Sequence, residues 1–393
     1  MSEREGDIAD AVDRVRLVDR LDRLVRTRSE NPPGEEAAAG RLAVEMCREL
    51  GGDVAVHEFA AGRPNVVARW ESGPGPTLGY CSHLDVVPAG DRSLWHHDPF
   101  GADIADGRLH GRGACDAKGP IAAALEAVAA LRDAGAELGG TLELELVSDE
   151  ETMGFVGAAR LVGDGVCRPD FAIVGEPTSL RVVHAQRGAC WLELTTRGLA
   201  GHGSAPERGR SAIRHMAEIV LWLDETLPDV SHPVLGGPSI TVGTIAGGEK
   251  VNIVPARFVI EIDRRLIPGE TPESVVRGVR SAIELAKRRF PEIDADVEVS
   301  FCAQPFEIDE RAPLVTTVAG ATAAATGAEA RLMGFRGASD ARFFADADID
   351  VVVCGPGDIA LAHTAREHID LGELEQAAVA YALAFARLLG PAG

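Results

Sequence analysis

The pattern of apolar and polar positions changes twice along the chain. Apolar residues recur at helical spacing over 8–28 and, after the break NPPG, over 35–50, which predicts two N-terminal helices. Short β-branched runs then alternate with helical stretches: NVVARW, TLGYCSHL, TLELELVS and FAIVGE. Such alternation is typical of a parallel or mixed sheet that carries helices on its faces.

From about Arg187 the predicted order becomes β-α-β-β-α-β, the order of a ferredoxin-like unit. After Phe301 the α/β rhythm returns and ends in a helix over 371–389. We therefore expect an α/β mixed-sheet catalytic domain formed by residues 1–186 and 300–393. An α+β domain at 187–299 would be inserted into it.

Composition narrows the class of protein. The chain has 393 residues, more than one hydrophobic core usually supports, so two domains are expected. The net charge of −22 disfavours an electrostatic nucleic-acid binder. The 7 cysteines are scattered without a CxxC pair, which argues against a disulfide framework and a thiolate zinc site. The acidic N-terminus lacks an apolar signal segment and no long apolar window follows, so we expect a cytoplasmic protein without membrane contact.

Five side chains of metal-ligating type stand beside turn-forming residues. They are His83 in HLD, Asp116 in CDAKG, Glu151 in SDEET, Glu176 in VGEPT and His363 in AHTAREH. Two imidazoles and three carboxylates form the ligand set of a two-metal hydrolytic centre, in which one carboxylate bridges the ions and a further acid handles protons. The chain is therefore predicted to be a metal-dependent enzyme.

Each of these residues also has an ordinary structural explanation. A histidine after a strand is often structural, Asp116 could cap the following helix, and an acidic pair often ends a strand in solvent. Two observations favour the metal site. The candidate ligands follow apolar strands, whose carboxyl ends collect ligand sites, and the three acids 149–151 would repel one another without a cation. Asp85 is expected to accept the imidazole N–H of His83 and to fix its tautomer.

Several motifs together resemble the co-catalytic zinc peptidases and deacylases of the M20 family. They are HLDVVP, GRGACDAKG, SDEET, VGEPT, RGLAGHGSAPE and the GPG segment followed by AHT-x-x-E. The resemblance extends over about residues 10–390 and includes the acetylornithine deacetylases and succinyl-diaminopimelate desuccinylases. It implies that His83 and Glu176 bind one zinc ion, that Glu151 and His363 bind the other, and that Asp116 bridges them. It further implies that Glu150 is the general base and that a cis peptide bond follows Asp116.

The resemblance also assigns roles to the inserted segment. That segment corresponds to the family's lid, which usually dimerises, so a homodimer is expected. His202 in AGHGSAPE would reach the active site of the neighbouring subunit and stabilise the oxyanion. Asn252 and Arg265 match lid positions that contact substrate, and Ser339 with Asp340 resembles a carboxylate-binding loop. The SDARF sequence of that loop departs from the acetylornithine deacetylase version and favours a succinyl or generic acyl substrate.

The expected function is hydrolysis of the amide bond of a small N-acyl amino acid, either N-acetyl or N-succinyl, with two divalent ions. Zinc is the first expectation, and cobalt or manganese are alternatives. A dipeptidase or carboxypeptidase of the same family is a second hypothesis. A catalytically silent zinc-binding protein is a third, but it predicts a damaged base or ligand, and all six positions are intact. Serine or cysteine nucleophiles are disfavoured because no GxSxG motif is present.

Overall fold

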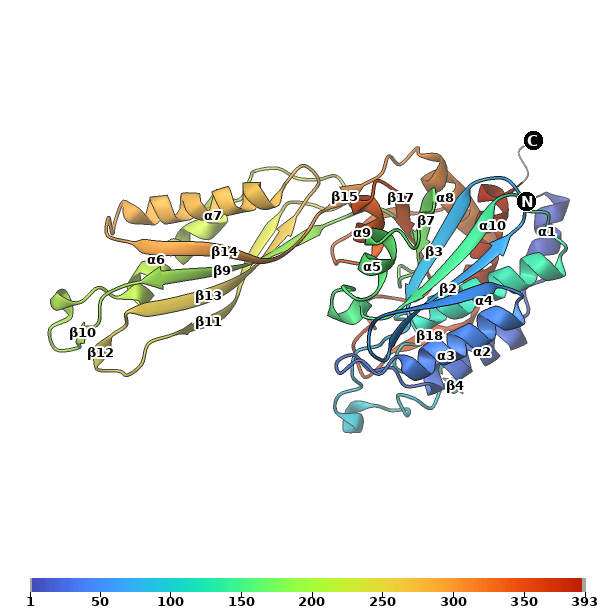
Figure 1. Cartoon of the computed structure of the whole chain (residues 1–393), viewed down its shortest axis with the longest axis horizontal. Coiled ribbons are helices and arrows are strands. Elements are labelled where there is room, and N and C mark those ends of the chain that lie inside the picture. Colours follow the sequence, from blue (N-terminus) through green and yellow to red (C-terminus); the bar gives the residue numbers. More distant parts are fainter. Residues whose placement is uncertain (1, 391–393) are drawn as a thin grey trace. The chain divides into compact units, whose positions relative to one another are not determined.

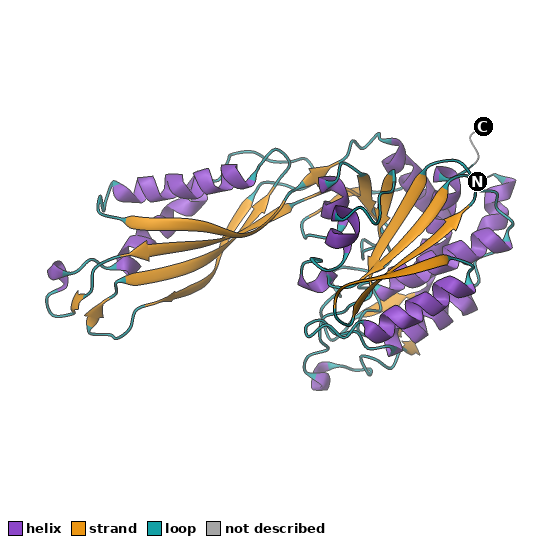
Figure 2. Cartoon of the chain, in the orientation of Figure 1, coloured by secondary structure: helices purple, strands orange, loops and turns teal. Residues whose placement is uncertain are grey.

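The alternating strands and helices of the sequence form a nine-stranded mixed sheet in the computed structural model, which describes residues 2–390. The chain divides into two compact units (Figures 1 and 2). Unit 1 extends to His184 and resumes over Ile308–Met333 and from Ser339 onward, whereas unit 2 comprises Ala185–Glu307 and Gly334–Ala338. The predicted fold class, a mixed-sheet α/β domain with an inserted α+β domain, is confirmed.

The large sheet has the strand order β1-β2-β6-β3-β7-β17-β8-β15, with β16 beside β8. Its strands are β1 (Asp53–Ala60), β2 (Arg63–Glu71), β3 (Thr77–His83), β6 (Thr141–Val147), β7 (Phe171–Val174), β8 (Val182–Gln186), β15 (Phe306–Glu307), β16 (Leu332–Phe335) and β17 (Asp350–Val353). The central strands β6, β3, β7 and β17 run parallel to one another. Their carboxyl ends therefore meet at one edge of the sheet.

The helices of unit 1 lie on both faces of this sheet. They are α1 (Glu3–Asp10), α2 (Arg14–Arg26), α3 (Ala37–Glu49), α4 (Lys118–Asp133), α5 (Ala158–Gly163), α8 (Pro313–Thr326), α9 (Ala341–Asp346) and α10 (Leu371–Leu388). Helices α1–α4, α8 and α10 share one buried apolar cluster with alternate residues of β2, β3 and β6. Helices α5 and α9 contact each other and lie on the opposite face (Figure 1). A small sheet of β4 (Asp103–Ala105), β5 (Arg108–His110) and β18 (His368–Asp370) completes the unit.

The first helical stretch differs from the sequence prediction. The apolar spacing over 8–28 predicts one helix, but α1 ends at Asp10 and α2 begins at Arg14. The break occurs because the Asp13 carboxylate accepts the backbone N–H of Val15 at 2.8 Å and of Arg16 at 3.1 Å. An aspartate in this position caps a new helix, and this local hydrogen bonding interrupts a continuous apolar pattern.

Unit 2 has the predicted ferredoxin-like order of elements. Strands β9 (Gly188–Arg197), β11 (Ser239–Gly247), β13 (Arg257–Leu266) and β14 (Asp294–Ala303) pair in the order β11-β13-β9-β14, and helices α6 (Ala212–Leu223) and α7 (Pro272–Lys287) pack on their apolar face. A separate two-stranded pair joins β10 (Gly201–His202) to β12 (Ile253–Val254). Among the described residues, no helix combines the length and the hydropathy needed to cross a membrane.

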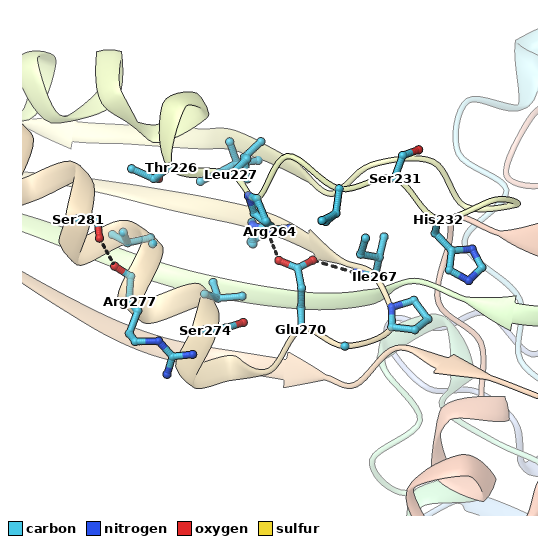
Figure 3. A pocket seen from close by; sticks show the side chains of 18 of the residues that line it. Thr226, Leu227, Ser231, His232, Arg264, Ile267, Glu270, Ser274, Arg277 and Ser281 are labelled. Carbon is cyan, nitrogen blue, oxygen red and sulfur yellow. Dashed lines mark hydrogen bonds and ion pairs between the residues drawn. The ribbon is translucent and has the colours of Figure 1, made fainter.

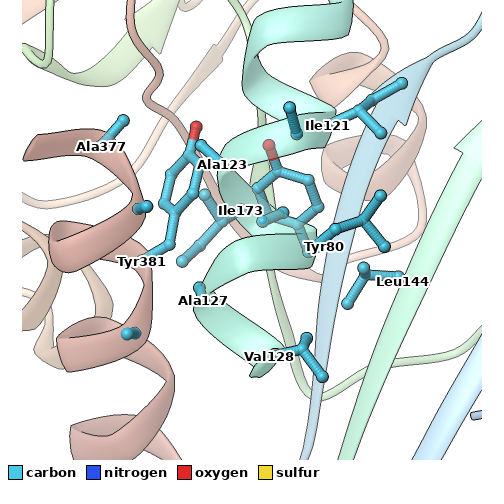
Figure 4. Close-up of a cluster of buried hydrophobic side chains, with 14 of the residues drawn as sticks. Tyr80, Ile121, Ala123, Ala127, Val128, Leu144, Ile173, Ala377 and Tyr381 are labelled. Carbon is cyan, nitrogen blue, oxygen red and sulfur yellow. The ribbon is translucent and has the colours of Figure 1, made fainter. Parts of the chain in front are cut away.

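Buried aromatic residues support the strand ends in unit 1. The rings of Tyr80 and Tyr381 meet edge to face at a centroid distance of 5.0 Å (Figure 4). Their hydroxyls donate hydrogen bonds to main-chain carbonyls, Tyr80 to Pro120 at 2.9 Å and Tyr381 to Cys354 at 2.7 Å. Because both hydroxyls are paired, the two large side chains fill the core without an unsatisfied polar group. They hold β3, α4 and α10 in fixed positions.

Substitution at Gly175 is expected to disturb this arrangement. A Cβ atom at Gly175 would lie 2.1 Å from the Tyr80 hydroxyl oxygen and 3.1 Å from the Pro120 side chain. Gly175→Ala should lower the free energy of unfolding by about 1–3 kcal/mol, measured by urea denaturation, because the packed tyrosine cannot withdraw. Gly163→Ala is the matched control, because its Cβ would meet no atom within 4 Å. Equal stabilities of the two variants would contradict the expected clash.

Candidate metal centre

The predicted ligands lie at the carboxyl ends of neighbouring strands in unit 1. His83 is the last residue of β3, which pairs with β6 on one side and β7 on the other. Glu150 and Glu151 form the turn after β6, and Glu176 follows the end of β7. The loop before α4 carries Asp116, and the loop after β17 carries His363. Five separate stretches of the chain thus converge on one edge of the sheet.

Asp116 lies between the two imidazoles. Its Oδ1 is 3.2 Å from Nε2 of His83, and its Oδ2 is 3.4 Å from Nε2 of His363. His83 Nε2 is also 3.8 Å from Glu176 Oε1, and His363 Nε2 is 2.9 Å from Glu151 Oε2. One carboxylate that offers a different oxygen to each of two histidines has the arrangement of a bridging metal ligand.

Glu150 belongs to the same group of side chains. The ligand atoms of His83, Glu150 and Glu176 lie within 4.8 Å of one another, as do those of His83, Asp116 and Glu151. Within residues 2–390, the buried Oε1 atoms of Glu151 and Glu176 have no hydrogen-bond partner. A buried carboxylate oxygen without a donor is costly. Free oxygens facing a shared space are typical of positions that bind a cation.

The electrostatics of the group indicate a shortage of positive charge. Burial raises the pKa values of Glu150, Glu151 and Glu176, and the neighbouring carboxylates raise them further. Burial alone would lower the pKa of His83, but the carboxylates of Asp116, Asp85 and Glu176 near its ring raise it well above its usual value. Hydrogen bonds to Asp116 and Glu151 raise the pKa of His363 to about 10. Divalent cations would supply the missing charge, so the donor set fits such ions.

Asp85 positions this site through two different groups. Nδ1 of His83 donates to the main-chain oxygen of Asp85 at 2.9 Å, whereas the Asp85 carboxylate is 3.6 Å away. The carboxylate instead accepts the backbone N–H of Glu150 at 3.3 Å and of Glu151 at 3.1 Å. Asn31 Nδ2 donates to it at 2.8 Å. The tautomer of His83 is therefore held by the main chain, and the side chain holds the acidic turn.

A buried glutamate that the sequence analysis did not assign supports the Asp116 loop. Oε1 of Glu367 accepts the backbone N–H of both Cys115 and Asp116 at 3.2 Å, and the guanidinium of Arg112 donates to the other oxygen. The peptide bond between Asp116 and Ala117 is cis, as expected. Glu367 is the last residue of the motif AHT-x-x-E, so the motif contained the signal but not the contact. Asn31, in the NPPG break, was likewise not assigned.

Three of the predicted functional residues belong to unit 2. His202 is exposed on β10, with Nδ1 2.6 Å from the Ser204 hydroxyl. The N–H of Gly203 donates to the main-chain oxygen of Asn252 at 2.8 Å, so Asn252 lies beside this strand. Arg265 on β13 pairs with Asp263 at 2.9 Å and stays partly exposed. Their side chains are accessible within unit 2.

Ser339 and Asp340 lie in unit 1 but are buried. Ser339 has no exposed surface, and its hydroxyl accepts the N–H of Ala341 at 3.4 Å. Ser339 therefore offers no surface to a ligand in this structure. The neighbouring Asp340 is 1% exposed and has no hydrogen-bond partner for either carboxylate oxygen within the described chain. Burial raises the pKa of Asp340 to about 6. A buried acid of this kind is poorly suited to bind a substrate carboxylate.

One cavity of unit 2 lies apart from these residues. It has a volume of about 830 Å³ and lies between the 226–240 segment and α7 (Figure 3). Arg264 and Glu270 line it and form an ion pair, and Glu270 also accepts the N–H of Ile267 at 3.0 Å. None of the predicted ligands or catalytic residues lines this cavity. The cluster in unit 1 is therefore the candidate functional site.

Known proteins resemble this chain in sequence. The model of peptidase family M20/M25/M40 matches residues 79–387. A succinyl-diaminopimelate desuccinylase of Methylobacillus flagellatus is 30% identical over 381 residues, which cover 93% of this chain and 97% of that protein. An acetylornithine deacetylase of Myxococcus xanthus is 34% identical over 343 residues, which cover 83% of this chain and 84% of that protein.

Solved structures share the fold. Aminopeptidase PepT of Bacillus cereus has a TM-score of 0.81 at 24% identity, covering 96% of this chain and 100% of that chain. The YXEP protein of Bacillus subtilis, called a dinuclear metal-binding peptidase of family M20, has a TM-score of 0.75 at 16% identity, covering 96% and 98%. The chain thus belongs to peptidase family M20/M25/M40 and is a metal-dependent hydrolase of amide bonds.

Proposed function

We propose that this enzyme hydrolyses the amide bond of a small N-acyl amino acid, releasing an N-acetyl or N-succinyl group. The observation that carries the proposal is the placement of Asp116 between His83 and His363 with Glu150 beside them. The names of the desuccinylase and deacetylase relatives support the substrate class. The departure of the SDARF loop from the acetylornithine deacetylase version favours a succinyl or generic acyl group.

We assign His83 and Glu176 to one divalent ion, Glu151 and His363 to the other, and Asp116 to both. The nitrogen and oxygen donors suit zinc first, and cobalt or manganese could take its place. Ions bound there would polarise the substrate carbonyl and lower the pKa of water. The side chains of the protein fix where these effects act.

Glu150 is assigned as the general base. It would take a proton from the attacking water and later pass that proton to the leaving amine. Burial raises the pKa of the Glu150 carboxyl, and a raised pKa suits a group that both accepts and returns a proton near neutral pH. Asp85 supports this role because its carboxylate accepts the Glu150 N–H at 3.3 Å.

The substrate contacts are assigned to unit 2. His202 would donate a hydrogen bond to the developing oxyanion, and loss of one such donor typically lowers kcat by about 10²–10³-fold. Asn252 would hold the substrate backbone. The guanidinium of Arg265, already paired with Asp263, would receive the substrate carboxylate.

The proposed function is tested by a substrate screen. The metal-loaded enzyme would be incubated with N-acetyl, N-succinyl and N-formyl amino acids and with dipeptides, with and without chelator. Chelator-sensitive release of a free amino acid from the N-acyl compounds is the expected result. Cleavage of dipeptides alone would favour the dipeptidase alternative. No turnover of any compound by enzyme with bound metal would favour the silent zinc-binding protein.

A homodimer formed through the inserted unit is part of the proposal. Strand β11 is an edge strand of its sheet, and Ile245 on it is 70% exposed. An unpaired edge with an exposed apolar side chain is a ready surface for a second copy. In such a dimer His202 would act in the active site of the partner subunit.

Mixing two inactive variants tests the action of His202 across the dimer. His202→Ala chains keep Glu150, and Glu150→Ala chains keep His202, so each heterodimer would contain one complete site. After subunit exchange, about a quarter of wild-type activity should return. The control mixture of Glu150→Ala with Asp116→Ala should stay inactive. Each substitution damages the site of its own chain, so neither site of the heterodimer is complete. Absence of recovery in the first mixture, with exchange confirmed by mass spectrometry, would contradict action in trans.

A further inference from the structure

Strand β6 buries two glutamates on the face away from the main core. Leu142, Leu144 and Leu146 join the apolar cluster on one face, so Glu143 and Glu145 point to the other. Alternation of this kind is typical of a strand with one face in water. Here Glu143 is 2% exposed and Glu145 is 0% exposed. The chain has therefore covered a face that its sequence pattern leaves polar.

The cover is the segment that follows α5. The guanidinium of Arg69 on β2 donates to the main-chain oxygen of Val166 at 3.0 Å. The N–H of Cys167 donates to the main-chain oxygen of Leu161 at 3.0 Å. A Cβ atom at Gly79 would lie 2.8 Å from the Pro169 ring. Residues 166–169 are thus fastened over β2, β6 and β3, and Cys167, which belongs to this segment, is completely buried.

Cys167 and the two glutamates meet in this covered space. One carboxylate oxygen of each glutamate and the Sγ atom of Cys167 lie within 4.8 Å of one another. Arg69 forms an ion pair with Oε2 of Glu143. Throughout residues 2–390, Oε1 of Glu143 and both carboxylate oxygens of Glu145 lack a hydrogen-bond partner. A Cβ atom at Gly79 would lie 3.1 Å from Glu145 Oε1, so the glycine leaves room for this carboxylate.

An ionised carboxylate buried without a partner is strongly unfavourable, so a positive charge or a proton must compensate it. With Cys167 as thiolate, the three acidic groups carry three negative charges and Arg69 supplies one positive charge. A divalent cation would balance the remaining two. Zinc binds thiolate sulfur at about 2.3 Å and carboxylate oxygen at about 2.0–2.2 Å, which places neighbouring ligand atoms about 3.5 Å apart. The three ligand atoms lie within 4.8 Å of one another, so small side-chain shifts would bring them to that spacing.

We propose that Glu143, Glu145 and Cys167 bind one divalent cation of the zinc type, which fastens the 166–169 segment to β6. This site shares no side chain with the metal centre at the strand ends. The thiolate makes the site softer than that centre, whose predicted ligands are imidazoles and carboxylates. Burial of all three side chains leaves no access for a substrate, so the proposed role of the site is structural. The scattered cysteines of the sequence do not reveal it, because tertiary folding alone brings Cys167 to β6.

Cobalt spectroscopy distinguishes this site from the other centre. Enzyme produced in cobalt-supplemented minimal medium should show a near-ultraviolet charge-transfer band from thiolate to Co²⁺, because the ligands assigned to the other centre include no sulfur. Cys167→Ser should abolish the band and remove one cobalt equivalent per chain. Cys47→Ser is the matched control, because Cys47 is also buried but lies in the main apolar cluster. That control should keep both the band and the metal content.

Two further variants keep the test decisive. His363→Ala should retain the thiolate band, since only the other centre is damaged. Glu145→Gln keeps the thiol. This variant should retain the two cobalt ions of the other centre but lose the third ion on dialysis, so it tests the site even if Cys167→Ser fails to fold. Absence of the band in cobalt-loaded wild-type enzyme, or its persistence in Cys167→Ser, would overturn the proposal. Either outcome would mean that a proton, not a cation, compensates the buried carboxylates. Burial raises the pKa of Glu145, so Glu145 would then be protonated and would share its proton with Glu143.

Discussion

Glu150→Gln is expected to lower kcat by about 10²–10⁴-fold, the usual contribution of a general base. The amide has nearly the same shape as the carboxylate but cannot take a proton from water. Because Glu150 is not among the assigned metal ligands, the variant should still bind two equivalents at the centre. Steady-state kinetics with the best substrate of the screen and metal analysis of the same sample provide the measurement.

The control for this substitution is Glu71→Gln, an exposed glutamate at the end of β2. It should have wild-type turnover and metal content. If Glu150→Gln kept near wild-type turnover, Glu150 would not be the base. If it lost metal together with activity, Glu150 would be a ligand, which its position within 4.8 Å of His83 and Glu176 ligand atoms would then explain. Metal content therefore separates the two possible roles of this carboxylate.

Asp116→Asn should have the larger effect on metal binding, because Asp116 is the side chain assigned to both ions. An amide offers one neutral oxygen in place of two charged ones. Changes to groups that only support a ligand cost about 10–100-fold in metal affinity, so replacing the bridging ligand should cost more. We expect the variant to lose both ions of the centre on dialysis and to lose turnover with them. Elemental analysis and kinetics check this result.

Thermal unfolding gives an independent readout of the same substitution. A ligand that binds only the folded state stabilises it by about 2.7 kcal/mol at a concentration 100 times its Kd. Chelation should therefore lower the Tm of the wild type by more than the Tm of Asp116→Asn, in which only the separate ion proposed at Cys167 is left to remove. Asp53→Asn, at an exposed position at the start of β1, should respond to chelator like the wild type. Retention of two tightly bound ions by Asp116→Asn would contradict the bridging assignment.

The convergence of the candidate ligands could be predicted from the sequence because local signals and topology agreed. His83 ends an apolar strand, Glu151 and Glu176 each follow one, and parallel strands necessarily bring their carboxyl ends to one edge. The two residues that reach this edge from loops, Asp116 and His363, were identifiable by their motifs. The distances of 3.2 Å and 3.4 Å from Asp116 to the two imidazoles required the folded chain.

The supporting contacts could not be predicted in the same way. Asp85 was expected to contact His83 through its carboxylate, yet its main-chain oxygen makes the hydrogen bond and the carboxylate accepts N–H groups of the acidic turn. Glu367 accepts N–H groups from a loop more than two hundred residues earlier in the chain. Spacing reveals neither contact. The side chain and the main-chain oxygen of Asp85 have the same sequence position, and Glu367 is far from its partners along the chain.

The sequence by itself determined the α/β architecture, the order of elements in the inserted unit and the chemical type of the candidate metal ligands. These features depend on local periodicity and on motifs whose residues are near one another in the chain. Only the tertiary structure decided that Ser339 is buried, that Glu143 and Glu145 face a covered space and that Cys167 joins them. Burial depends on which segments pack over a strand, and an alternating pattern is the same whether water or residues 166–169 cover its polar face.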